Sequence, residues 1–341
     1  MTYPADNQTL NLVRASSPDA GAAMDSPFHR GERQLQAAIG VREKVERMGQ
    51  RVIRDFLPAE HAEFYAGLPF IFLGSVDGSG RQWASMLTGR PGFMSSPDPG
   101  TLTIDALPVA GDALRGNLQT NARLGLLGID YAPRRRNRLA AAVAATTDTA
   151  IQLDIHQTFG NCPMYIQARD YLPADTTEDM QAELPHTTFS HFDEAAQTFI
   201  QQADNFYIAS HHTDADDKHV RNGVDVSHRG GKPGFVRIND DQSLTFPDFR
   251  GNRHFNTLGN IVLNKQAGLL FVDFTNGDLL QLTGTAVIDT DSPDIARFDG
   301  AERLVHFTLD TGTLLPKAIP GKWNFIDYSP RLAKTGSWTR N

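Results

Sequence analysis

An internal duplication constrains the fold of this 341-residue chain more than any other feature of its sequence. Short blocks of the first half return in the second half in the same order, 142 or 143 residues further along. The paired blocks are Arg90–Phe93 with Lys232–Phe235, Leu102–Asp105 with Leu244–Asp248, Asn121 with Asn264, and Gly125–Leu127 with Gly268–Leu270. Repeats that build solenoids span roughly 20–50 residues, so a period this long indicates two whole domains.

Each copy contains short apolar segments that are typical of β-strands. The segment 70–76 is rich in Phe and Ile, and the turn residues Asp77–Gly80 separate it from a second strand at 83–87. Further strands are expected at 101–104, 124–130, 138–145 and 151–157, and in the second copy at 206–210, 234–238, 244–246, 269–274 and 279–288. Turns rich in Gly, Asp and Asn connect these strands, which favours antiparallel neighbours.

Few helices are expected. Apolar positions at helical spacing predict a helix over 32–48, and helices are also expected near 58–67, 113–121, 193–202 and 255–263. A parallel sheet needs a helical crossover after nearly every strand, and most connections here are too short for one. The sequence therefore predicts a mainly β (α+β) fold with two tandem antiparallel barrels and flanking helices.

Composition excludes several classes of protein. The net charge of −8 argues against a dedicated nucleic-acid binder, which needs cations to neutralise phosphates. No apolar run approaches the ~20 residues that span a membrane, and the polar segment 1–25 does not resemble a secretory signal. Cys162 is the only cysteine, which leaves no intramolecular disulfide and no cysteine-rich metal centre. We expect a cytoplasmic protein that binds neither nucleic acid nor membrane.

Two polar clusters occur in the second copy only. Asp225–Phe235 gathers a hydroxyl, an imidazole, a guanidinium and the adjacent Gly230 and Gly231 near a strand, so side-chain donors and backbone amides can both approach a ligand. Pro247–His254 lies between a predicted strand and a predicted helix, where the helix dipole and its amides favour an anion. Together the two clusters predict a phosphate site; the alternative interpretation is that both are solvated turns.

The order of these motifs resembles that of the flavin-binding split-barrel proteins related to pyridoxamine 5'-phosphate oxidase. The resemblance covers about residues 190–290 and rests on Ser227–Gly230, Pro233–Phe235, Pro247–Asn252, Thr257–Asn260 and Gly268–Phe271. It implies two tandem split β-barrels, face-to-face packing of two protomers, and FMN in the groove between them. Trp323 and Trp338 do not match the pattern that holds the vitamin substrate in pyridoxamine phosphate oxidase, so the substrate stays unassigned.

Carried onto this chain, the resemblance implies a set of FMN-binding residues in the second copy. The phosphate and ribityl chain would be held by Ser227, Arg229, Arg250, Asn252 and Arg253, with Asp225, His228, Asp248 and Thr257 nearby. Gln281, on a late strand, would contact the flavin or simply face solvent.

The implied function is that of an FMN-dependent oxidoreductase that uses a small-molecule substrate or an electron donor such as NAD(P)H. A non-catalytic protein that binds flavin or another phosphate ligand is the main alternative, and haem or deazaflavin binding on the same barrel is a third. A homodimer is also expected. The expected organisation is an N-terminal arm at 1–30, a first split-barrel repeat with its helices at 31–180, an FMN-binding second repeat at 181–315, and a C-terminal tail at 316–341.

Three features leave alternatives open. The basic run Arg134–Arg138 is either a solvated strand end or a surface that faces an anionic ligand or the other domain. Cys162, in the segment 160–167, is either a small buried filler or lies close to the flavin. The neighbouring His211 and His212 would point to opposite faces of a strand, so no metal site is expected there. The acidic loop that follows them either covers the ligand or is a mobile excursion.

Overall fold

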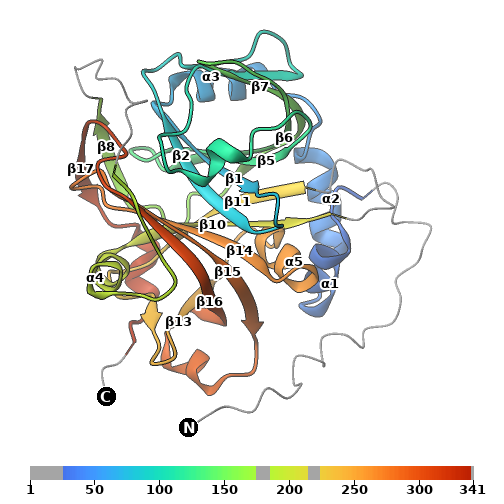
Figure 1. Cartoon of the computed structure of the whole chain (residues 1–341). Coiled ribbons are helices and arrows are strands. Elements are labelled where there is room, and N and C mark those ends of the chain that lie inside the picture. The colour runs from blue at the N-terminus through green and yellow to red at the C-terminus, as the bar shows by residue number, and fades with distance from the viewer. Residues whose placement is uncertain (1–25, 174–184, 214–222, 339–341) are drawn as a thin grey trace.

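A computed structural model describes residues 26–173, 185–213 and 223–338, and one antiparallel sheet forms the centre of each copy (Figure 1). The first copy contains β1 (Phe70–Val76), β2 (Gln82–Thr88), β3 (Met94–Ser95), β4 (Thr101–Ile104), β5 (Arg123–Asp130), β6 (Arg135–Thr146) and β7 (Ile151–Asn161). The second copy contains β10 (Asn205–His212), β11 (Gly223–Gly230), β12 (Arg237–Ile238), β13 (Ser243–Phe249), β14 (Gln266–Val272), β15 (Leu279–Asp289) and β16 (Ala301–Leu315).

The two sheets have the same strand order. It is β2-β1-β5-β6-β7-β4-β3 in the first copy and β11-β10-β14-β15-β16-β13-β12 in the second, so each strand of the second copy takes the place of one in the first. The registers agree as well. Gly125 of β5 pairs with Gly74 of β1, and its counterpart Gly268 of β14 pairs with Ala209 at the same place on β10. The prediction of two tandem antiparallel split barrels is confirmed.

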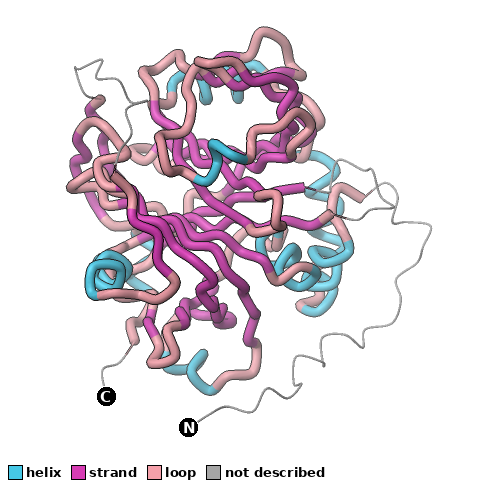
Figure 2. The backbone as a smooth tube through the Cα atoms, in the orientation of Figure 1, coloured by secondary structure: helices cyan, strands magenta, loops and turns pink. Residues whose placement is uncertain are grey.

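Short helices surround the strands, as Figure 2 shows. They are α1 (Arg30–Ala38), α2 (Arg42–Val52), α3 (Ala59–Gly67), α4 (Glu194–Gln202) and α5 (Asn256–Leu263), with 3-10 turns η2 (Ala113–Gly116), η3 (Pro293–Arg297) and η4 (Pro330–Lys334). The single helix predicted over 32–48 is wrong. Gly40 follows α1 with φ of 69°, a left-handed conformation that ends one helix before α2 begins. No helix among the described residues is both long and apolar enough to cross a membrane.

Segments from both ends of the chain tie the copies together. The α1 helix precedes the first barrel in sequence but packs against α5 of the second barrel, where Gly31 and Gly259 allow close approach of the two backbones (Figure 1). Near the other end, β17 (Lys322–Asp327) pairs with β8 (Ala168–Leu172), so the expected C-terminal tail includes a strand. A further short strand, β9 (Thr187–Phe189), pairs with β16.

The copies share an apolar core in addition to the core inside each barrel. This shared core joins residues of β1, β2 and β5 to residues of β10, β11 and β14. At its centre the rings of Phe72 and Tyr207 stack with centroids 3.6 Å apart and planes 14° apart. Burial of apolar surface of this kind is the main force that holds such faces together.

Two glycines show that the packing of the copies is reciprocal. A Cβ added to Gly125 would lie 2.6 Å from the carbonyl oxygen of Val224, and a Cβ added to Gly268 would lie 2.5 Å from that of Gln82. Gly125 and Gly268 hold equivalent positions, and so do Val224 and Gln82 on the partner strands. Reciprocal contacts are the signature of a two-fold interface. The chain therefore forms, within itself, a pseudo-symmetric dimer of barrels.

Candidate functional site

A polar pocket lies on the seam between the two copies. Its walls are Arg136, Arg138, Asn161 and Cys162 of the first copy and Ser227, His228, Arg229, Asp248, Phe249, Gly251, Asn252, Arg253, Phe255, Asn256, Thr257, Leu258, Glu302 and Arg303 of the second. We call it the arginine pocket. Its cavity volume of about 90 Å³ is several times the ~10–15 Å³ that one water molecule needs.

The arginine pocket carries a strong positive charge. Five arginines line it, whereas its carboxylates among the described residues are Asp248 and Glu302 on the lining and Asp225 beside it, paired with Arg138, which leaves a net positive charge of two. Burial, with the neighbouring arginines, lowers the pKa of His228 well below its usual value, so this imidazole stays neutral. Such a pocket favours an anion, and guanidinium groups are well suited to paired hydrogen bonds with phosphate oxygens.

Ion pairs hold the arginines of the second copy in place. Asp248 accepts hydrogen bonds from Arg229 and, at 3.0 Å, from Arg303. Glu302 accepts from Arg253 at 2.7 Å and from Arg303 at 3.0 Å. Because Asp248 is 4% exposed and Arg303 6% exposed, these contacts are largely shielded from solvent. The guanidinium groups are therefore ordered before any ligand arrives, which reduces the entropy cost of binding.

The first copy supplies two further arginines from β6. Arg138 donates to Asp225 at 2.8 Å, to the Asn256 side-chain oxygen at 3.1 Å, and to the Ser227 hydroxyl. Arg136 donates instead to the Cys162 carbonyl at 2.6 Å and lies 3.5 Å from the Cys162 sulfur. Among the described residues, Arg136 forms no ion pair with a carboxylate. Burial lowers its pKa, which indicates a cation whose charge is poorly compensated.

Several buried polar atoms of the pocket have no hydrogen-bond partner in the part of the chain that the structure describes. They include both ring nitrogens of His228, the side-chain nitrogen of Asn161, and the Nε atoms of Arg138 and Arg229. His228 is only 6% exposed, so water reaches its ring poorly. Each buried polar group without a partner destabilises the fold by about 1–3 kcal/mol. A ligand with oxygen acceptors would remove this cost for those of the unpartnered atoms that are hydrogen-bond donors.

The N-terminus of α5 adds backbone donors. Its first residues, Asn256 to Leu258, line the pocket, and the N-cap residue Phe255 provides no side-chain hydrogen bond. Phe255 and Arg253 both adopt the left-handed region, with φ of 65° and 67°. Left-handed conformations of residues other than glycine are uncommon and strained, and they concentrate at functional sites. The uncapped amides of α5 and its dipole favour an anion at this end.

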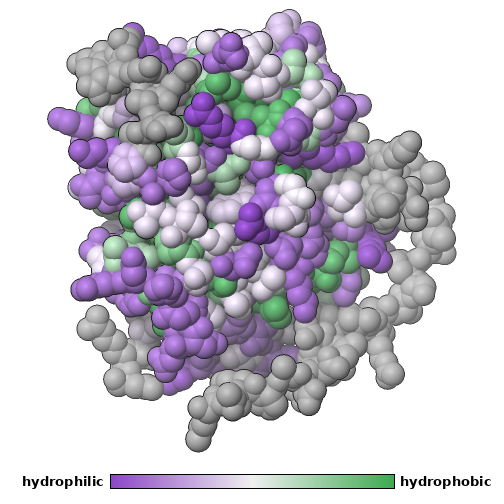
Figure 3. Space-filling view, viewed as in Figure 1, coloured by the Kyte–Doolittle hydropathy of each residue, from purple (hydrophilic) through white to green (hydrophobic). Residues whose placement is uncertain are grey.

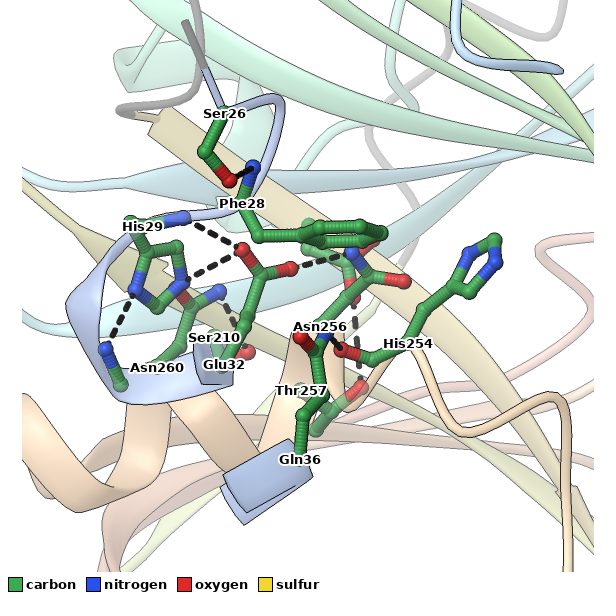
Figure 4. Close-up of polar contacts among 12 residues, drawn as sticks. Ser26, Phe28, His29, Glu32, Gln36, Ser210, His254, Asn256, Thr257 and Asn260 are labelled. Atoms are coloured by element: carbon green, nitrogen blue, oxygen red, sulfur yellow. Dashed lines mark hydrogen bonds and ion pairs between the residues drawn. The ribbon is translucent and has the colours of Figure 1, made fainter. Parts of the chain in front are cut away.

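A smaller cavity extends the site toward α1, and Figure 4 shows the polar contacts around it. It shares Arg138 and Asn256 with the arginine pocket. Glu32, on its wall, accepts hydrogen bonds from the backbone of His29 at 2.8 Å and from the side chain of Asn256 at 2.5 Å. Burial raises the pKa of Glu32 to about 8 against these hydrogen bonds, and nearby Asp225 adds to the rise.

The raised pKa of Glu32 should make the free energy of unfolding depend on pH. In the unfolded chain Glu32 loses its proton near its ordinary pKa of 4.5, but in the folded chain it keeps the proton up to about pH 8. The stabilisation from this group is therefore complete below about pH 4.5 and is lost as the pH rises to about 8, a change on the order of a few kcal/mol. Glu32→Gln removes the titration. The free energy of unfolding of this variant, minus that of the wild type, should therefore be larger at pH 8 than at pH 5, as measured by urea titration. An unchanged difference at the two pH values would contradict this.

Most of the residues predicted from sequence meet at the arginine pocket. Seven of the ten line it: Ser227, His228, Arg229, Asp248, Asn252, Arg253 and Thr257. Asp225 lies next to it, bonded to Arg138 and to Ser227. Arg250 is exposed and does not line the pocket. Gln281 does not face solvent, because it is 0% exposed, and it bonds to Ser85 and Asp112 on the other side of the seam.

The sequence left the contribution of the first copy open, because its basic run was either a solvated strand end or a surface that faces an anionic ligand or the other domain. Polar anion-binding residues were expected in the second copy only, but Arg136 and Arg138 come from the basic run of the first copy. Alternation along β6 turns these two toward the seam, whereas Arg135 is exposed. Arg136 and Arg138 therefore face the other domain, whereas Arg135 forms a solvated part of the run. Cys162 also lines the pocket and is half-buried, so it is not a fully buried filler. The acidic loop after His212 falls largely outside the described residues.

Another cavity lies in the first copy and has a different character. Its volume is about 230 Å³, and it is lined by Leu107, Pro108, Arg115, Leu118, Gln119 and Thr146. Figure 3 shows apolar side chains exposed over the first barrel on a face that is otherwise largely hydrophilic. Its polar lining residues are Arg115, Gln119 and Thr146, far fewer than the polar groups that converge on the arginine pocket, so the arginine pocket is the better candidate site.

Comparisons with known proteins give only distant matches. No protein-family model and no curated protein sequence matches the chain. Similar solved structures include HupZ from Group A Streptococcus, at 15% identity and a TM-score of 0.27, which matches 35% of this chain and 89% of its own. A Lactobacillus delbrueckii protein assigned to the pyridoxamine 5'-phosphate oxidases matches at 18% identity and 0.25, over 31% of this chain and 95% of its own. HutZ, the haem storage protein of Vibrio cholerae, matches at 13% identity and a TM-score of 0.25, over 37% of this chain and 95% of its own.

Proposed function

We propose that the arginine pocket binds the phosphate of FMN and that the chain is an FMN-dependent oxidoreductase. The observation that carries the proposal is the set of five arginines gathered from both copies, with only three carboxylates of the described residues paired to them, beside the uncapped end of α5. This donor set fits a phosphate dianion. The seam between two barrels is also where the resemblance in sequence implies that a flavin would lie.

The surroundings of the pocket support a ligand larger than a phosphate. The neighbouring cavity adds apolar walls from Leu139, Phe159 and Val224 beyond Arg138 and Asn256. An organic group attached to the phosphate could extend in this direction, between β6 and the segment that leads into α1. Both walls of the site come from one chain, so a homodimer, which the resemblance also implies, is not needed to complete it.

A bound flavin would supply the electron-transfer chemistry, and the residues of this chain would bind and orient it. Arg136, Arg138 and the amides of α5 would hold the phosphate, while the pairs of Asp248 with Arg229 and Arg303 would keep the donors in position. A small-molecule substrate or NAD(P)H would be the electron donor.

The visible spectrum of the purified chain tests this proposal. We expect an oxidised-flavin spectrum, either as isolated or after addition of FMN, and a released chromophore with the mass of FMN. Bleaching of the bound flavin by NADH or NADPH would support an oxidoreductase, whereas a flavin that neither reduces would support the non-catalytic alternative. A colourless protein that takes up no FMN, or one with a haem spectrum, would refute the proposal.

A further inference from the structure

The 230 Å³ cavity of the first copy lies at one end of its barrel, and we call it the barrel-end cavity. Leu107 and Leu118 on its wall pack against the apolar core of that barrel, and Pro108 adds a third apolar wall. None of its lining residues lines the arginine pocket. An apolar cavity of about 150 Å³ can hold a benzene molecule, so this cavity is large enough for one aromatic ring with a substituent.

The second copy fills the corresponding end of its own barrel with a phenylalanine. Residues 290–300 join β15 to β16, and Phe298 of this connection is 1% exposed within the core of the second barrel. Its ring lies 5.8 Å from the ring of Phe249. Phe249 is the counterpart of Leu107, 142 residues further along. Phe298 therefore packs between its connection and the counterpart of a wall of the barrel-end cavity.

The first copy has no counterpart of Phe298. Only residues 147–150 join β6 to β7, and this connection contains no aromatic residue. Thr146, the last residue of β6, lines the barrel-end cavity together with Leu107. The cavity thus lies between the short connection and Leu107, as Phe298 lies between the long connection and Phe249. An aromatic ring from a ligand would fill the space that the first copy leaves open.

Two of the three polar side chains around the barrel-end cavity already have partners. Gln119 donates a hydrogen bond to the carbonyl oxygen of Gly116, and Thr146 donates to that of Leu118 at 3.3 Å. Neither side chain carries a charge, and no acidic residue lines the cavity in the part of the chain that the structure describes. The remaining polar side chain, an arginine, therefore sets the charge of the cavity.

That arginine is Arg115 of η2, whose exposed guanidinium forms no hydrogen bond or ion pair with the described residues. Asp112, three residues earlier, turns its carboxyl group away from it, toward Ser85 at 2.6 Å and Gln281 at 3.0 Å. A guanidinium binds a carboxylate through paired hydrogen bonds, and its single positive charge matches a monoanion. The cavity therefore combines apolar walls with one cation that lacks an anionic partner.

We propose that the barrel-end cavity binds a small aromatic carboxylate. The ring packs against Leu107, Pro108 and Leu118, where the second barrel has Phe298, and the carboxylate accepts hydrogen bonds from Arg115. This site shares no lining residue with the arginine pocket, so it does not depend on the proposed function.

Benzoate and benzamide are suitable probes, because the two molecules have the same shape and only benzoate carries a charge. Calorimetric titration of the full chain measures their affinity and stoichiometry. Arg115→Gln removes the proposed partner of the carboxylate. Arg90→Gln is the matched control, since Arg90 is also an exposed arginine of the first copy but does not line the cavity. Arg136→Ala tests whether benzoate binds in the arginine pocket instead, and circular dichroism confirms that each variant is folded.

We expect one benzoate per chain with a dissociation constant of about 1 mM or tighter. Affinity should be about fivefold weaker for benzamide with the wild type and for benzoate with Arg115→Gln. Arg90→Gln and Arg136→Ala should bind benzoate within twofold of the wild type, and Arg115→Gln should leave the affinity for FMN unchanged.

Three results would overturn the inference: no saturation at about 10 mM benzoate, equal affinities for benzoate and benzamide, or a loss of benzoate binding in Arg136→Ala but not in Arg115→Gln. Benzoate binding with the expected pattern in a chain that takes up no FMN would uphold the inference and refute the proposed function.

Discussion

Alanine at Gly125 or Gly268 is expected to destabilise the chain by about 3 kcal/mol, at the upper end of the usual cost of overpacking a core. The added methyl group would lie 2.6 Å or 2.5 Å from a backbone carbonyl oxygen of the other copy. Backbone atoms in a paired strand cannot move aside as a flexible side chain can. The two barrels would have to separate locally, at the apolar core that joins them.

The melting temperature provides the measurement, and a fall of roughly 5–10 °C is expected for each variant. Gly160→Ala is the matched control, because Gly160 also lies in a strand but an added Cβ there meets nothing within 4 Å. The control should melt close to the wild type. If all three variants melted together, the seam between the copies would not be packed as described.

Arg136→Ala is expected to weaken FMN binding by about tenfold or more, since hydrogen bonds to charged groups contribute about 1.5–3 kcal/mol. Arg136 is the pocket arginine with the least compensated charge, because its partners are the carbonyl and sulfur of Cys162. Its loss leaves no carboxylate of the described residues unpaired, so the variant should remain folded. Fluorescence titration with FMN measures the change.

The control for this experiment is Arg250→Ala. Arg250 belongs to the same sequence cluster as Arg253, but its side chain is exposed and lies outside the pocket lining. Its affinity for FMN should stay within twofold of the wild type. A larger loss of affinity in Arg250→Ala than in Arg136→Ala would contradict this. It would indicate that the phosphate binds at Arg250, outside the pocket, as predicted from sequence.

The duplication made most of the fold predictable. Turn residues and apolar segments repeat along the chain, so most strands of both sheets could be anticipated from local pattern. The prediction missed β3, β11 and β16, the last of which is the longest strand of the second sheet. The division of the helix over 32–48 could not be anticipated, because the break at Gly40 depends on a left-handed residue within an otherwise helical pattern. Nor did any local pattern show that α1 would cross from the first barrel to the second.

The candidate site was half predictable for a related reason. Ser227, Arg229 and Arg253 belong to compact motifs within one copy, which a sequence displays directly. Arg136 and Arg138 reach the same pocket only through packing of one copy against the other, a contact between distant parts of the chain. Gln281 shows the reverse case, since the same packing buries it against Ser85 and Asp112, away from the arginine pocket.

Comparison of FMN with riboflavin tests the central claim most directly, because the two ligands differ only in the phosphate. If the arginine pocket binds the phosphate, FMN should bind at least 100-fold more tightly than riboflavin, a difference of about 2.7 kcal/mol. Inorganic phosphate should compete with FMN, and higher salt should weaken FMN but not riboflavin. Equal affinities for the two flavins, or binding of neither, would contradict the account.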